Sequence, residues 1–331
     1  MPQLAQISAT RNKIDESRQY MPCKLVLRPS FPELLDSLCQ WMRTLCDKAP
    51  IAPKWVLVPT STTANYLRIH LAQQAKERVF AGLRIVPITT FVQRLMEFNS
   101  TTFSQRWGPA EELLLFEVVE ELSEQSSLAR LKNIPRGYVL LRPTFLDLAD
   151  AGFGPQQSEV LEELAHEPDL IPVEKEAISL YGKWIRSLQH RKISWGPLLQ
   201  QSIPNWIVEA NERDLRIRLA CEKGQSAEIL VYGFYDFTDV NADIIGALSR
   251  RTNLTLFYPF LGKDVPAHAA FFFAEKILAD LKVRLGTALE DTTGKEPLVE
   301  VSPELSKHEI TSFFISTFPD GQVNEKPHFL T

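Results

Sequence analysis

The sequence contains no glycine before Gly82, and this absence bears directly on nucleotide binding. A phosphate-binding loop surrounds its anion with backbone that lacks Cβ atoms, typically in the pattern G-x-x-x-x-G-K. The first expected strand, CKLVL at 23–27, leads instead into Ser30-Phe31-Pro32. Gly-Lys pairs occur later, but the residue five positions before each of their glycines is Ala177, Phe257 or Leu289. The sequence therefore argues against ordinary ATP hydrolysis.

Patterns for metal binding and for covalent catalysis are also missing. The six histidines show neither H-x-H nor H-E-x-x-H spacing, and the four cysteines form no C-x-x-C pair, so we expect reduced and mostly buried thiols. A PD-(D/E)xK nuclease needs an acidic residue, one intervening residue and a lysine on a strand. Glu174 and Glu325 are followed directly by lysines and lie on no apolar strand. We expect no metal, no cofactor and no catalytic residue in this chain.

Charge and hydropathy argue against two further classes of protein. The net charge is −5, so no global basic field marks the chain as a nucleic-acid binder, and any such contact must be local. No apolar run approaches the roughly 18 residues of a membrane span. The first twenty residues also lack the apolar stretch of a signal peptide, which makes the cytoplasm the expected location.

Short apolar segments alternate with helical patterns at both ends of the chain. Expected strands lie at 23–27, 55–58, 83–88, 228–232 and 254–258. Expected helices lie at 32–47, 64–76, 91–97, 242–251 and 269–285. Buried strands separated by helices predict an α/β fold, with a parallel sheet and helices on both of its faces.

The middle of the chain shows helical patterns and no convincing strand. These patterns lie at 110–122, 145–151, 158–165 and 173–190. We therefore predict one discontinuous α/β domain, 22–100 plus 226–290, interrupted by an all-helical insertion at 101–225. The tail at 291–331 is rich in Ser, Thr, Pro and Glu and ends on PHFLT, so we expect it to begin a further domain of a longer protein.

Three expected strands end in distinctive motifs, and their order resembles UvrD-like superfamily 1 helicases. VLVPTSTTANYLRIHL at 56–71 resembles the first loop that touches single-stranded DNA in that family. RIVPITTFVQRL at 84–95 resembles the second, with Val92 in place of a histidine. The resemblance implies loop contacts to DNA from six residues: Thr60, Ser61, Thr62, Thr89, Thr90 and Phe91.

The third motif, ILVYGFYDFTDVN at 229–241, follows the helical insertion. Tyr232 and Gly233 stand where the family's Mg²⁺-binding Asp and catalytic Glu belong. Phe234 and Asp236 match its retained Phe and second Asp. The motif therefore resembles an acidic motor motif that has lost its carboxylates.

The match is closer to the AddB subunit of AddAB-type helicase–nucleases, which carries a degenerate helicase region. KEAISLYGKWIRSL at 175–188 also resembles a Tyr-containing helix of its inserted subdomain, and the resemblance spans about residues 22–285. It implies a catalytically inactive, RecA-like helicase core (1A) with a 1B-like insertion. The implied partners are single-stranded DNA and an AddA-like helicase–nuclease subunit, in double-strand break processing and recombination repair. The family's nuclease domain, with its iron–sulfur cluster and Mg²⁺, would follow residue 331.

Several of these residues have plainer interpretations. The Ser and Thr residues at 60–62 suit N-caps, and Phe91 suits helix packing. Asp236 and Asp239 could bind a cation or cap the next helix. The arginines of RDLRIR at 213–218 could be solvated or could contact DNA or a partner, and the acidic helix at 111–124 suits solvent or a protein partner. An alternative function is a protein-interaction scaffold that keeps the helicase fold without binding DNA.

Overall fold

The computed structural model describes residues 23–28, 30–75, 82–96, 107–222, 225–234, 237–259, 272–285 and 289–291. Asp236 and the tail from 292 onward lie outside these ranges. None of the helices in the described ranges combines the length and the apolar character that a membrane crossing requires.

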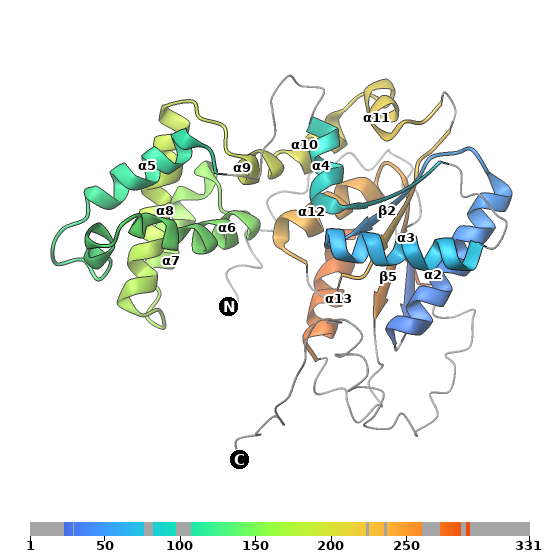
Figure 1. Ribbon diagram of the computed structural model, residues 1–331, viewed down its shortest axis with the longest axis horizontal. Helices are drawn as coiled ribbons and strands as arrows, with labels where there is room; N and C mark the ends of the chain where they lie inside the picture. The colour runs from blue at the N-terminus through green and yellow to red at the C-terminus, as the bar shows by residue number, and fades with distance from the viewer. Residues whose placement is uncertain are drawn as a thin grey trace, which may run out of the picture.

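A parallel sheet forms one part of the molecule (Figure 1). Its strands are ordered β3-β2-β4-β5-β1-β6, and every pairing is parallel. The strands are β1 (Cys23–Arg28), β2 (Lys54–Val58), β3 (Leu83–Pro87), β4 (Glu228–Tyr232), β5 (Asn253–Pro259) and β6 (Leu289–Asp291). The predicted α/β class with a parallel sheet is confirmed. All carboxyl ends of the strands therefore meet at one edge of the sheet.

Alternate strand residues fill two cores, one on each face of the sheet. Val56 and Tyr232 pack on one face with α2 (Phe31–Lys48) and α3 (Ser61–Ala75). The other face is covered by α4 (Ile88–Met96), α12 (Asp239–Ser249) and α13 (Phe272–Leu285), whose apolar residues pack with Leu57 and Val231. The period of two along each strand places successive side chains in opposite cores.

The helices between 107 and 190 gather beyond one side of the sheet and have a separate core (Figure 1). Trp184 is fully buried at its centre, with ring centroids 4.9 Å from Trp107, 4.8 Å from Trp195 and 5.3 Å from Phe145. We call this region the helical part. Its elements are α5 (Pro109–Glu120), η2 (Ala129–Asn133), η3 (Gly137–Leu141), α6 (Arg142–Asp150), η4 (Pro155–Gln157), α7 (Ser158–Ala165) and α8 (Pro172–His190).

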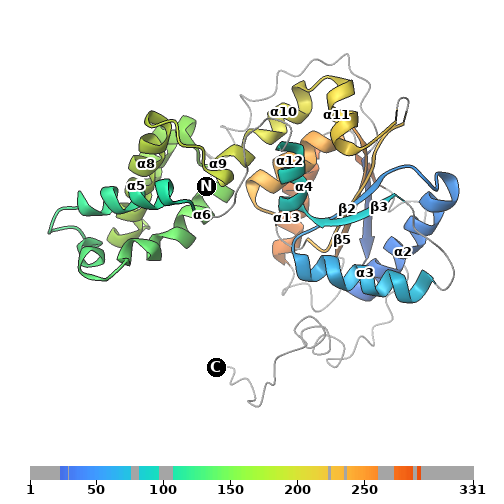
Figure 2. The same cartoon turned by 45° about the horizontal axis from the view of Figure 1, so that its top comes forward.

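Three short helices lead back from the helical part to the sheet. They are α9 (Gly196–Gln200), α10 (Ile203–Glu209) and α11 (Glu212–Leu219). Figure 2 shows α10 and α11 beside the sheet, where Ile207 and Leu215 join its core and Trp55 donates its indole N–H to the Leu219 carbonyl at 3.1 Å. The segment 101–225 thus holds two kinds of helix, some with their own core and some packed on the sheet.

Candidate nucleic-acid interface

The two threonine-containing segments lie next to each other at the carboxyl edge of the sheet. β2 pairs with β3 in a register that sets Val58 opposite Pro87. Two residues separate β2 from α3, and α4 begins directly after β3. α3 lies on one face of the sheet and α4 on the other. Their first turns therefore flank the same edge from opposite sides.

Thr60 caps α3. Its Oγ1 accepts from the Thr63 amide at 3.1 Å and lies 2.9 Å from the Thr63 hydroxyl, while its carbonyl accepts from the Ala64 amide. Ser61 and Thr62 belong to the first helical turn and are exposed, so their expected placement in a loop was wrong. The cap starts the helix three residues before the expected 64, because it satisfies the Thr63 amide of the first turn.

The second segment is also helical from its start. α4 follows β3 without an intervening loop, so Thr89, which is half-buried, and Thr90, which is exposed, lie in its first turn rather than in the expected loop. Phe91 is only 1% exposed, and its ring packs edge-on against Trp55 at 5.2 Å. A ring buried to this extent is not open to a DNA base, so the implied DNA contact of Phe91 is contradicted. Phe91 instead packs in the core against Trp55.

The third strand end is buried and closed. Tyr232 is 3% exposed, and burial, with smaller contributions from Tyr66, Cys39 and Asp36, raises its pKa above the ordinary tyrosine value. Gly233 has a φ of 79°, a left-handed conformation that favours glycine, and a Cβ there would stand 3.4 Å from Thr63 Cγ2. Gly233 therefore lets the end of β4 turn close against the start of α3.

The start of α3 and the end of β4 form a topological switch point. The helix after β2 covers one face of the sheet, and α12, which follows β4, covers the other. β2 and β4 are neighbours, and their connections leave toward opposite faces of the sheet. Open α/β sheets commonly bind ligands at this kind of position.

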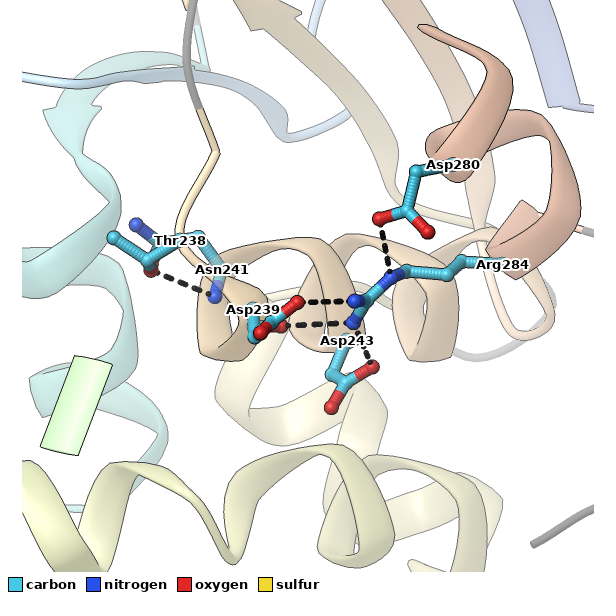
Figure 3. A network of polar contacts seen from close by, with 6 residues as sticks. All are labelled: Thr238, Asp239, Asn241, Asp243, Asp280 and Arg284. Atoms are coloured by element: carbon cyan, nitrogen blue, oxygen red, sulfur yellow. Dashed lines mark hydrogen bonds and ion pairs between the residues drawn. The ribbon is translucent and has the colours of Figure 1, made fainter. Parts of the chain in front are cut away.

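Asp239 neither caps α12 nor offers a free carboxylate (Figure 3). The cap is Thr238, whose hydroxyl accepts from the Asn241 amide at 3.3 Å. Asp239 is paired with Arg284, which also contacts Asp243 at 2.8 Å and Asp280 at 2.9 Å. Burial lowers the pKa of Arg284, but the three carboxylates outweigh it and raise this pKa above its ordinary value. In the described ranges no group of three or more potential ligands is placed to hold a metal ion.

The connection from β1 to α2 is too short for a phosphate-wrapping loop. β1 ends at Arg28 and α2 begins at Phe31, so two residues separate them. Ser30 caps the helix, with its hydroxyl accepting from the Glu33 amide at 3.3 Å. A loop of the G-x-x-x-x-G-K type places more residues between strand and helix than this connection holds.

No family model matches this sequence. No curated protein is significantly similar to it either. Any functional assignment therefore rests on the fold and on the geometry of this edge.

Tyr66, on α3, is a further candidate contact that we did not predict from the sequence. It lies one helical turn after Thr62 on the same side of α3, is 55% exposed and stacks on His70 with ring centroids 6.0 Å apart. A signal was present in the sequence, since an aromatic residue four positions after a candidate contact shares its helix face.

The RDLRIR cluster makes contacts within the protein. Arg218 is 8% exposed and stacks over Trp206 at 4.1 Å, and Arg216 lies 3.8 Å from Glu212. Arg213 is exposed on α11. Arg218 therefore links α11 to α10, Arg216 pairs within α11, and the cluster is not an open basic patch.

Proposed function

We propose that this chain is a helicase-like α/β domain that binds single-stranded DNA across the carboxyl edge of its sheet. In this proposal it belongs to an AddB-type subunit, and an AddA-like helicase–nuclease partner supplies ATP turnover during break processing and recombination repair. The observation that carries the proposal is the adjacency of the α3 and α4 first turns at one edge. Two separate segments that resemble DNA-contacting motifs meet here.

The contacts would be made by hydroxyls and backbone amides. The amides of a first helical turn point out of the helix, and the positive end of the helix dipole favours phosphate. Exposed hydroxyls of Ser61, Thr62 and Thr90 add hydrogen bonds to phosphate oxygens, as is common in nucleic-acid complexes. The exposed ring of Tyr66 would stack on a base in the same stretch of DNA.

The geometry of β1 and β4 supports binding without ATP turnover. The two-residue connection after β1 offers no phosphate loop, and the buried Tyr232 takes the position that the resemblance assigns to a metal-binding carboxylate. We therefore expect a flat thermal-shift response to ATP with Mg²⁺, because a ligand stabilises a protein only when it binds the folded state.

Binding of a fluorescent oligo(dT) by anisotropy tests the proposal. We expect binding at about 50 mM salt that weakens at about 200 mM, because phosphate contacts release counterions. The triple variant Ser61→Ala/Thr62→Ala/Thr90→Ala should bind about tenfold or more weakly, at roughly 1 kcal/mol for each lost hydrogen bond. Thr60 is left intact because it caps the helix.

Thr144→Ala is the matched control, since Thr144 is also an exposed threonine in the first turn of a helix, α6, but lies in the helical part. It should bind like the unchanged chain. Absence of oligo(dT) binding at low salt, or equal binding by the triple variant, would overturn the proposal. That result would leave the scaffold alternative, which the net charge of −5 favours.

A further inference from the structure

A groove on the helical part exposes large apolar side chains. It is a cavity of about 330 Å³ between α5 and the η2–η3 segment, with Phe116 and Val119 on one side and Leu131, Ile134 and Tyr138 on the other. Phe116 is 43% exposed and Ile134 46% exposed. Exposed apolar residues that gather around a cavity mark an interaction site more often than scattered ones do.

A third apolar side chain extends the groove along α5. Leu113 lies one helical turn before Phe116 on the same side of the helix and is 53% exposed. The ring of Phe116 is held edge-on against Tyr138, with centroids 5.9 Å apart. The groove therefore has one fixed aromatic ring, with a further exposed apolar residue one helical turn away on α5.

The wall opposite α5 has a fixed backbone. Arg136 adopts a left-handed conformation with a φ of 60°, which is costly for a residue other than glycine. At Gly137 an added Cβ would stand 2.2 Å from the Leu131 carbonyl oxygen, and the Gly137 amide donates to the Ile134 carbonyl at 2.8 Å. Ile134 is thus held toward solvent by a tight turn, so the groove exists before any partner arrives.

The charge around the groove selects the kind of partner. Residues 109–124 contain six glutamates and no lysine or arginine. Glu112, Glu117 and Glu124 form ion pairs with Arg136, Arg191 and Lys132, respectively. Lys132 and Arg136 also line the groove, and they are the cations of two of these pairs. Among the described residues no ion pair is seen for Glu120, the third charged residue of the lining, and its uncompensated carboxylate favours a cation.

We propose that this groove docks a protein segment that presents a large apolar side chain with a lysine or arginine about one helical turn away. The apolar side chain would enter the cavity against Phe116 and Ile134. The cation would lie beside Glu120. This is the pattern of an amphipathic helix in a groove, in which a few anchoring side chains carry most of the binding energy.

Selection from a library of displayed random peptides, about sixteen residues long, tests the proposal on the whole chain. We expect the enriched peptides to share an apolar residue with Lys or Arg three or four positions away. Synthetic copies should bind the Ile134→Ser and Phe116→Ser variants about tenfold or more weakly. Glu120→Lys should weaken the basic peptides and should enrich acidic ones when the selection is repeated.

Ile171→Ser is the matched control, because Ile171 is an isoleucine of the same helical part, 57% exposed and outside the groove. It should bind the peptides like the unchanged chain, and circular dichroism should show that all variants are folded. Three outcomes would overturn the proposal: no enrichment, equal binding by the Ile134→Ser and control variants, or a concentration-dependent dimer that Ile134→Ser dissociates. The last outcome would make a second copy of this chain the occupant.

Discussion

Strand pairing orders the sheet cores, whereas a cluster of aromatic rings around Trp184 lies at the centre of an otherwise aliphatic core in the helical part. In the sheet, residues such as Val56 and Leu57 alternate between two faces, so the backbone pairing decides what each side chain contacts. In the helical part, contacts among five large rings contribute to the packing of the helices.

The difference extends to the surface features that carry our two proposals. Parallel strands bring the first turns of α2, α3, α4 and α12 to one edge, so the candidate DNA interface follows from topology. The groove beside α5 has no such origin. It depends on a tight turn and on the packing of Phe116 against Tyr138. Changes in packing should therefore affect the groove more than the edge.

The largest effect should come from Trp184→Ala. Trp184 contacts four rings and donates its indole N–H to the Glu111 carbonyl at 3.3 Å, which links α8 to α5. Loss of a fully buried large aromatic side chain costs about 3–5 kcal/mol. We expect the helical part to unfold at lower urea while the sheet part keeps its transition, followed by tryptophan fluorescence and circular dichroism.

Trp206→Ala provides the comparison, because the half-buried Trp206 packs against the sheet core. It should shift the transition of the sheet part. A single transition for the whole chain in both variants would show that the two cores do not unfold independently.

Two glycine substitutions should give the next largest changes in the free energy of unfolding. One should destabilise the sheet part, and the other should stabilise the helical part. Gly233→Ala places a Cβ on a left-handed backbone and should cost about 1–2 kcal/mol. Gly182→Ala lies inside α8, where the nearest atom to an added Cβ is 3.9 Å away, and should stabilise by about 0.5–1 kcal/mol. Urea denaturation measures both. Stabilisation by Gly233→Ala would contradict the turn that closes β4 against α3.

The strands could be predicted well from the sequence. All five expected strands agree with β1 to β5 within one residue at each end, because buried parallel strands appear as continuous apolar runs. The starts of α3 and α4 were missed, since Ser and Thr suit a cap, a loop or a first turn equally well.

Long-range packing could not be predicted in the same way. The burial of Phe91 depends on Trp55 from a neighbouring strand, and the packing of α10 and α11 on the sheet depends on contacts with Trp55 and Arg251. The groove at Ile134 depends on the left-handed backbone conformation of Arg136, which no local sequence pattern predicts. These features are tertiary, so periodicity does not encode them.

Removal of the polar network around Arg284 should lower the stability of the sheet part by a moderate amount. Arg284→Met keeps the apolar stem and removes the pairs with Asp239, Asp243 and Asp280, whose side chains are 40–58% exposed. A partly exposed network of this kind is worth about 1 kcal/mol. We expect faster hydrogen exchange in α12 and α13, and a difference from the unchanged chain that narrows in high salt. Equal exchange in both proteins would show that the network does not hold α13 to α12.

The smallest change in the free energy of unfolding should come from substitution of Glu176 in the helical part. One carboxylate oxygen of Glu176 accepts from the Ser126 hydroxyl at 2.6 Å, the Ser127 hydroxyl at 2.8 Å and the Leu128 amide at 3.2 Å. Burial raises the pKa of Glu176, but these hydrogen bonds outweigh it and lower this pKa below the ordinary value. A depressed pKa stabilises the fold above the unfolded-state value, about 4.3, and this stabilisation is lost as pH falls through the folded value.

Glu176→Gln should therefore cost about 0.5–1 kcal/mol at neutral pH and almost nothing in acid. Glu163→Gln, an exposed control on α7, should cost little at either pH. Urea denaturation at several pH values measures this, and a cost for Glu176→Gln that is independent of pH would show that the charge of the carboxylate does not hold the 126–128 turn.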